Sequence, residues 1–187
     1  RDRPRRVWGV RAGAVGLLDA ALWDARAKAE GRPLWRTLAA RYLTVGANRR
    51  IATYGSCGHY RPGEQLDQLK DDVQRALDAG FRTVKIKVGG TSLSEDLRRV
   101  DTVMSVLTGA RVANASRPNA AGLTAAPFRL AVDVNGRLAA PLAEAWLGAM
   151  SSMNVAWVEE PASALDFAAL ADFVRLTGAP IGTGENL

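Results

Sequence analysis

The sequence predicts an α/β protein in which parallel strands alternate with helices. From about residue 51 onward, short apolar runs typical of strands alternate with segments whose apolar residues recur at helical spacing. Three acidic residues, Asp133, Glu159 and Glu185, each stand at the end of such a run and are evenly spaced along the chain. Their spacing fits one strand, one helix and two short loops. The pattern therefore favours a parallel sheet built from repeated strand and helix units.

Two helices are expected before the first strand. Apolar residues at helical spacing predict a helix over about residues 10–30, with Gly31 placed to end it. A second, shorter helix is predicted over about residues 33–42, because proline suits the first helical position. We expect residues 1–47 to be the end of a helical segment from a separate domain, and residues 48–187 to contain the repeated units.

The repeat region is expected to contain five strands with four helices between them. The strands are predicted at residues 51–56, 83–88, 129–134, 155–159 and 180–184. The helices are predicted at about residues 66–79, 92–109, 141–153 and 166–177. Ser92 and Glu95 form a capping box at the start of the second of these helices. Residues 110–127 show no clear period, and we expect an extended loop there.

Five parallel strands are compatible with an open, doubly wound sheet or with part of a (β/α) barrel. An open sheet that binds a dinucleotide would carry a Gly-x-Gly-x-x-Gly turn after its first strand, and the sequence has none there. A barrel instead collects functional groups from the carboxyl ends of several strands. Since the three acids stand at strand ends, we predict a partial, modified TIM-type (β/α) barrel of about five strands, preceded by helices of another domain.

The composition argues against membranes and nucleic acids as binding partners. The chain is 48% hydrophobic and 24% charged, as expected of a globular protein, and no apolar run approaches the roughly 20 residues of a membrane-spanning helix. Its net charge of +6 is scattered over helix-like segments without interleaved aromatic residues, so we expect neither membrane nor nucleic-acid binding. The single cysteine, Cys57, excludes an internal disulfide and favours a reducing compartment, which points to the cytoplasm.

The strand Val84 to Val88 contains two lysines on one face. Side chains alternate across a strand, so Lys85 and Lys87 face one side and the apolar residues face the other. Two neighbouring, partly desolvated ammonium groups repel each other, and at least one should lose its proton more easily than a free lysine does. We interpret this pair as containing a general base. An edge strand with solvated lysines is the alternative.

The three evenly spaced acids suit a metal site. A hard divalent ion such as Mg²⁺ prefers oxygen ligands and is often held by a few carboxylates together with water and substrate. Asp133, Glu159 and Glu185 come from three neighbouring strands, so we predict that they converge on such an ion. His59, the only histidine, follows the first strand and is a candidate for substrate contact, with a structural role as the alternative.

At these residues the chain resembles the enolase superfamily, and within it the mandelate racemase-like branch. The motifs that carry the resemblance are Leu18-Asp19-Ala20-Ala21-Leu22-Trp23-Asp24, Val84-Lys85-Ile86-Lys87-Val88-Gly89, Val132-Asp133-Val134-Asn135-Gly136-Arg137, Glu159-Glu160-Pro161 and Gly184-Glu185-Asn186. The resemblance implies an α+β capping domain, whose last helices would lie in residues 1–47, over a modified (β/α) barrel. It also implies an essential Mg²⁺ and abstraction of the proton α to a substrate carboxylate.

The resemblance also implies roles for single residues. It assigns the metal ligands to Asp133, Glu159 and Glu185 and the base to Lys87, with Lys85 on the substrate carboxylate. Asn135 and Ser56 match positions that contact substrate. Glu160 lies on the opposite side of its strand from Glu159 and is left out of the site. A second acid/base group, usually a histidine on a later strand, would lie beyond Leu187.

Within the branch, the chain most resembles acid-sugar dehydratases, in particular the tartrate type, on residues 33–42, 54–60 and 183–187. We therefore hypothesise a Mg²⁺-dependent carbon–oxygen lyase that dehydrates a small hydroxy acid or acid sugar, such as tartrate or an aldonate. We expect the whole protein to be a homo-oligomer and interpret the 187 residues as a fragment of it. One alternative is a racemase, epimerase or cycloisomerase of the same superfamily. The other is a half barrel without catalytic activity.

Overall fold

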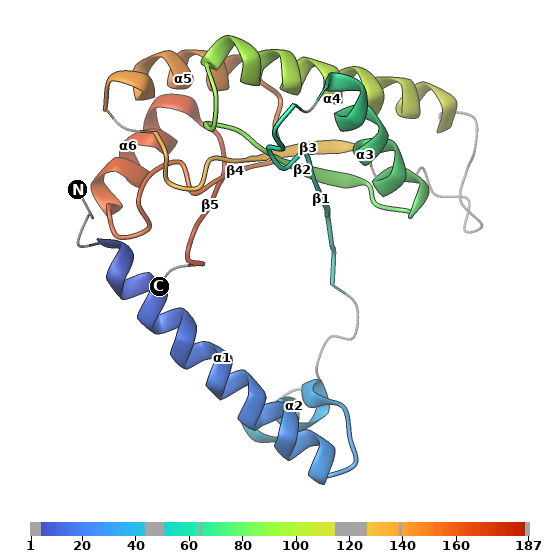
Figure 1. Cartoon of the computed structure of the whole chain (residues 1–187), viewed down its shortest axis with the longest axis vertical. Coiled ribbons are helices and arrows are strands. Elements are labelled where there is room, and N and C mark those ends of the chain that lie inside the picture. The colour runs from blue at the N-terminus through green and yellow to red at the C-terminus, as the bar shows by residue number, and fades with distance from the viewer. Residues whose placement is uncertain (1–4, 44–50, 64, 115–126, 139, 186–187) are drawn as a thin grey trace. The chain divides into compact units, whose positions relative to one another are not determined.

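The computed structural model describes residues 5–43, 51–63, 65–114, 127–138 and 140–185 (Figure 1). Its elements are α1 (Arg5–Ala29), α2 (Leu34–Tyr42), β1 (Gly55–Cys57), α3 (Leu66–Asp78), β2 (Thr83–Lys87), α4 (Leu93–Asn114), β3 (Arg129–Asp133), α5 (Ala140–Ser152), β4 (Val158–Glu159), α6 (Phe167–Thr177) and β5 (Ile181–Gly182). The chain divides into two compact units, residues 1–52 with 185–187 and residues 53–184, and each is described by itself.

The first unit contains the two predicted helices. After α1, Gly31 adopts a φ of +64°, a conformation that glycine reaches at little cost, and the chain turns into α2. The rings of Trp23 and Tyr42 meet edge to face with their centroids 5.7 Å apart, and Thr37 donates a hydrogen bond of 3.1 Å to Glu30. The domain boundary predicted after residue 47 falls outside the described residues and stays a prediction.

The second unit contains a five-stranded parallel sheet with the order β1-β2-β3-β4-β5. Each strand pairs with the next one along the chain, whereas a doubly wound sheet reverses its strand order partway across. Helices follow each of the first four strands, and in Figure 1 α3, α4 and α5 lie along one side of the sheet. This arrangement confirms the predicted partial (β/α) barrel.

The hydrophobic core lies between the sheet and its helices. The strands, with the residues that directly follow β2 and β3, contribute alternate apolar residues that are almost completely buried, namely Val84, Ile86, Val88, Leu130, Val132, Val134 and Val158. The helices contribute the facing residues Leu69, Val73, Val103, Leu107, Trp146 and Met150. Because side chains alternate along a strand, the residues between these apolar positions face away from the helices. The predicted lysines and acids of β2, β3 and β4 occupy that other face.

Several predicted boundaries shift. β1 begins at Gly55 instead of residue 51, because its pairing with β2 starts at Val84. α4 continues past Gly109 to Asn114, since the good helix formers that follow this glycine, among them Ala110, Arg111 and Ala113, outweigh its low helix propensity. Most of the loop predicted at residues 110–127 lies outside the described residues. None of the described helices has both the length and the apolar character needed to cross a membrane.

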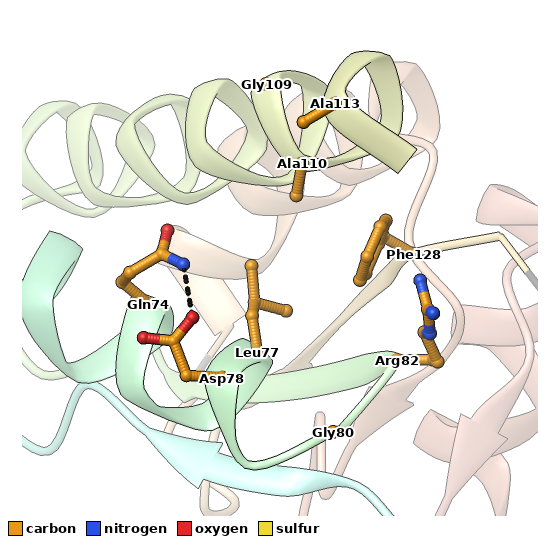
Figure 2. A pocket seen from close by; sticks show the side chains of 9 residues that line it. All are labelled: Gln74, Leu77, Asp78, Gly80, Arg82, Gly109, Ala110, Ala113 and Phe128. Carbon is orange, nitrogen blue, oxygen red and sulfur yellow. Dashed lines mark hydrogen bonds between the residues drawn. The ribbon is translucent and has the colours of Figure 1, made fainter. Parts of the chain in front are cut away.

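A pocket of about 390 Å³ opens at the amino ends of the strands (Figure 2). It lies between the last turns of α3 and α4, and Arg82 and Phe128, which precede β2 and β3, line it. The Arg82 guanidinium carbon lies 4.5 Å from the Phe128 ring centroid, and Gln74 donates a hydrogen bond of 2.8 Å to Asp78. The predicted chemistry occupies the carboxyl ends of the strands, so this pocket belongs to the other end of the sheet.

Candidate active site

Four charged side chains meet at the carboxyl ends of β2, β3 and β4. The strand register places Lys87 opposite Asp133, and Asp133 opposite Glu159. Lys85 lies two residues before Lys87 and therefore shares its face. Pairing in parallel register thus brings together residues that are up to 74 positions apart in the sequence. The prediction that the lysines and the acids of these strands face the same side is confirmed.

The four side chains form a continuous network of ion pairs. Nζ of Lys87 lies 2.5 Å from Oδ2 of Asp133, and Nζ of Lys85 lies 3.2 Å from the same oxygen. Lys85 also lies 2.5 Å from Oε1 of Glu159. The side chain of Asp133 is completely buried, and burying a charge is costly unless a partner compensates it. Two ammonium groups and two carboxylates balance each other here.

Two aromatic rings lie beside the network. Nζ of Lys85 is 5.0 Å from the ring centroid of Tyr54, which meets the ring of Trp157 edge to face at a centroid distance of 5.2 Å. The indole Nε1 of Trp157 donates a hydrogen bond of 3.4 Å to Glu159. Neither ring was among the predicted site residues. Strand alternation was the available signal for Trp157, which lies two residues before Glu159.

Asp133 and Lys85 stabilise each other in their ionised forms. Burial favours protonation of Asp133, but the hydrogen bonds and charges of Lys87 and Lys85 outweigh it and hold the pKa of Asp133 below its usual value. Burial also disfavours the ammonium of Lys85, yet Glu159, Tyr54 and Asp133 raise the pKa of Lys85 well above its usual value. Lys85 is therefore not the lysine of the pair that loses its proton easily, because its carboxylate neighbours outweigh repulsion between the lysines.

The other predicted substrate-binding residues lie at neighbouring strand ends. Ser56 is an exposed residue of β1 that pairs with Lys85 in the strand register. Asn135 is exposed, has a φ of +52°, and donates its backbone N–H to Oδ1 of Asp133 at 3.0 Å. His59 lies exposed in the loop after β1. Their proposed contacts with substrate stay predictions.

Two of the three predicted metal ligands, Asp133 and Glu159, lie in the unit that contains the sheet. Among the residues that the structure describes, no group of three or more His, Cys, Asp or Glu side chains is placed to hold a metal ion. Glu185 is exposed and belongs to the unit that contains α1 and α2. Asp133 and Glu159 are adjacent in register and offer the hard carboxylate oxygens that Mg²⁺ prefers, so their chemistry fits this ion. The complete ligand set stays a prediction.

Glu160 has a structural position that the sequence did not indicate. It is buried and has a φ of +47°. Its Oε1 accepts hydrogen bonds of 2.9 Å from the Thr183 hydroxyl and from the Gly184 N–H. Glu160 therefore ties the end of β4 to the segment after β5.

Comparison with known proteins identifies the class of the chain. A family model described as Enolase C-terminal domain-like matches residues 68–187. This match covers most of the chain and includes the four residues of the ion-pair network. The chain therefore belongs to this family, and the resemblance to the enolase superfamily is confirmed.

Curated relatives are acid-sugar enzymes. The chain is 30% identical to L-talarate/galactarate dehydratase from Salmonella typhimurium over 96% of its own length and 39% of that protein. It is 33% identical to D-galactonate dehydratase from Xanthomonas oryzae pv. oryzae over 93% of its length and 41% of that protein. The chain thus spans about two fifths of the length of these relatives.

Solved structures show the same fold. The Salmonella typhimurium dehydratase, liganded with Mg and L-lyxarohydroxamate, matches with a TM-score of 0.66 and 29% identity, covering 89% of this chain and 37% of that one. A mandelate racemase/muconate lactonizing enzyme from Polaromonas sp. JS666 also gives a TM-score of 0.66, with 27% identity over 90% of this chain and 40% of that one.

The ionised state of Asp133 can be tested by its effect on stability. Because its pKa is held below the usual value, the ion pairs contribute stability above the unfolded-state pKa of about 3.9, and this contribution is lost as the pH falls through the lower folded-state pKa. We expect wild type to be more stable than Asp133→Asn from about pH 5 to pH 8, and the difference to shrink below about pH 4. Urea unfolding at a series of pH values measures it.

Asp101→Asn is the matched control, because Asp101 is an exposed residue of α4. Its unfolding free energy should stay close to that of wild type throughout the same pH series. A difference between wild type and Asp133→Asn that grew as the pH fell would contradict the assigned ion pairs.

Proposed function

We propose that the whole protein is a Mg²⁺-dependent dehydratase that removes water from an acid sugar or a related hydroxy acid. The ion-pair network of two lysines with Asp133 and Glu159 at the carboxyl ends of parallel strands carries this proposal. Relatives that dehydrate talarate, galactarate and galactonate support the substrate class. Tartrate, indicated by resemblance, stays a candidate within it.

Asp133, Glu159 and Glu185 would hold the Mg²⁺. When bound, the ion would stabilise the negative charge that develops on the substrate carboxylate during proton abstraction, the chemistry that this superfamily assigns to it. The presence of Mg in the solved talarate/galactarate dehydratase supports this assignment. Asp133 and Glu159 already offer oxygen atoms side by side, and both now contact ammonium groups.

The two lysines differ in ways that suit two roles. The side chain of Lys85 is 8% exposed and contacts both acids, whereas that of Lys87 is 21% exposed and contacts Asp133. A lysine that is held charged suits binding of a substrate carboxylate and of the enediolate formed from it. The more accessible Lys87 suits the base. Its Nζ would take the α-proton, and the electrons of that C–H bond would form the enediolate. The β-hydroxyl would then take a proton, from the Lys87 ammonium or from a second acid/base group, and leave as water, which gives an enol and then a keto acid.

A second candidate is a cycloisomerase or racemase that uses the same proton abstraction. The chain is 29% identical to 3,6-anhydro-alpha-L-galactonate cycloisomerase from Streptomyces coelicolor over 96% of its length. The reactions diverge only after the enediolate forms. A third possibility, a half barrel without activity, is favoured by β1 and β5, each of which pairs on one side only among the described residues. Unpaired strand edges invite association with other chains.

Lys87→Ala tests the base. We expect this variant to lose exchange of the substrate α-proton in deuterated water by at least about 100-fold, since it lacks a positioned base, while its circular dichroism spectrum stays that of wild type. NMR of an acid-sugar substrate measures the exchange. Lys70→Ala, at an exposed position of α3, is the control and should exchange at the wild-type rate. Persistent exchange in Lys87→Ala would remove Lys87 as the base.

Glu159→Gln tests the metal site without any need for turnover. Because a neutral amide is a weaker ligand than a carboxylate, we expect Mg²⁺ binding to weaken by at least about 10-fold in calorimetric titration with MgCl₂ alone. Glu144→Gln, at an exposed position of α5, should bind like wild type. Equal Mg²⁺ affinity in both variants would contradict the assigned ligand.

Product analysis separates the candidate reactions. With a panel of acid sugars that includes galactarate, galactonate and tartrate, we expect a keto acid and no epimer, because the proposed reaction expels the β-hydroxyl. Mass spectrometry and carbonyl-specific derivatisation measure the product. An epimer or cyclised isomer would favour the second candidate. Turnover by the 187 residues alone as a monomer would contradict the inactive half barrel.

A further inference from the structure

Two side chains hold the turn that follows the proposed base. Asp96, in the first turn of α4, is completely buried, and its Oδ2 accepts the Gly89 N–H at 2.8 Å. Its Oδ1 accepts a hydrogen bond from the hydroxyl of Tyr60, which in turn accepts the Gly90 N–H at 3.0 Å. The N–H groups of Gly89 and Gly90 are therefore bound by side chains from α4 and from the loop after β1.

The conformation of this turn depends on those contacts. Gly89 has a φ of +78°, in the region that favours glycine. A side chain at Gly90 would overlap the ring of Tyr60. The ring therefore packs directly on the backbone of the turn while its hydroxyl binds the same residue.

A third side chain links α4 to the loop after β1. Arg99 is buried, and its Nη2 donates a hydrogen bond of 2.7 Å to the carbonyl oxygen of Gly58. Its guanidinium carbon lies 4.6 Å from the ring centroid of Tyr60. The same Gly58 oxygen accepts the backbone N–H of Lys87 at 3.4 Å. Arg99 therefore reaches the backbone of Lys87 through a single carbonyl group.

Helix stability alone does not account for this cluster. An acid in the first turn of a helix is favoured by the helix dipole, but an exposed carboxylate would serve as well, and Glu95 already lies beside it. Burial disfavours the ionised form of Asp96 and raises its pKa, so placing a carboxylate here has a cost that apolar residues would avoid. Its contacts instead converge on one stretch of backbone, from Lys87 to Gly90.

We propose that Tyr60, Asp96 and Arg99 are positioning residues that fix the backbone around Lys87 so that its amine meets the substrate α-carbon. This inference rests on the proposed role of Lys87 as base. The cluster holds the backbone at Lys87, through Gly58, and at Gly89 and Gly90. Displacement of a catalytic group by about 1 Å can lower the rate by about 100-fold, so such a support has a direct effect on turnover.

Tyr60→Phe in the whole protein tests the support. The variant keeps the ring beside Arg99 and removes the hydroxyl that joins Asp96 to Gly90. We expect kcat per folded molecule to fall by at least about 10-fold and KM to change by less than about 3-fold, because substrate binding is not altered. We also expect faster amide hydrogen exchange at residues 87–90. Tyr42→Phe, which removes an exposed hydroxyl from α2, should change neither.

Asp96→Asn is a second variant, with exposed Asp101→Asn on the same helix as its control. It should lower kcat and speed amide exchange at residues 87–90 in the same way. If amide hydrogen exchange at residues 87–90 were unchanged in both Tyr60→Phe and Asp96→Asn, the cluster would not hold this backbone, whatever the activity of the variants. A fall in kcat that only matched a loss of folded protein would overturn the positioning role. Absence of substrate α-proton exchange in wild type would instead overturn the proposed function. Amide hydrogen exchange at residues 87–90 would still show whether the cluster holds the backbone around Lys87.

Discussion

The parallel register of β2, β3 and β4 is the constraint on which the rest of the site depends. It sets Lys87 beside Asp133 and Asp133 beside Glu159. A slip of one residue would turn these charges into the core and the valines toward solvent. Burial of Ile86 and Val132 on the opposite face makes such a slip costly, at about 1.5–3 kcal/mol for each large apolar side chain exposed. The hydrophobic core therefore fixes the geometry of the charges.

The balance of charge is the second consequence of that register. Asp133 has no exposed surface, and it is stable as a carboxylate because two ammonium groups lie within 3.2 Å of one of its oxygens. A divalent cation that took over Asp133 and Glu159 would add two positive charges to a neutral cluster. The carboxylate of the proposed third ligand, Glu185, and one carboxylate of the substrate would offset them. Within the proposed function, the metal and an acidic substrate are therefore electrostatically complementary at this cluster.

The sequence predicted what depends on local pattern and missed what depends on tertiary neighbours. Strand alternation and even spacing were sufficient to place Lys85, Asp133 and Glu159 on one face. The expectation that at least one of the two lysines loses its proton easily does not hold for Lys85, whose charge is stabilised by a carboxylate 74 residues away. Asp96 was not among the predicted site residues, and its partner Tyr60 is 36 residues distant in the sequence. The extension of α4 past Gly109 followed from neighbours with high helix propensity.

Within the proposed function, the two lysines show how a rigid scaffold can leave a reactive group able to change partners. Lys85 is held through its side chain by two acids, which suits a charge that stays in place. Lys87 is held chiefly through its backbone, where Gly58 accepts its N–H and the turn after it is bound by Asp96. Its amine has one carboxylate contact to exchange. A base must stay in position, and its amine must also be able to gain and lose a proton. A fixed backbone meets the first requirement, and an amine with a single carboxylate contact meets the second.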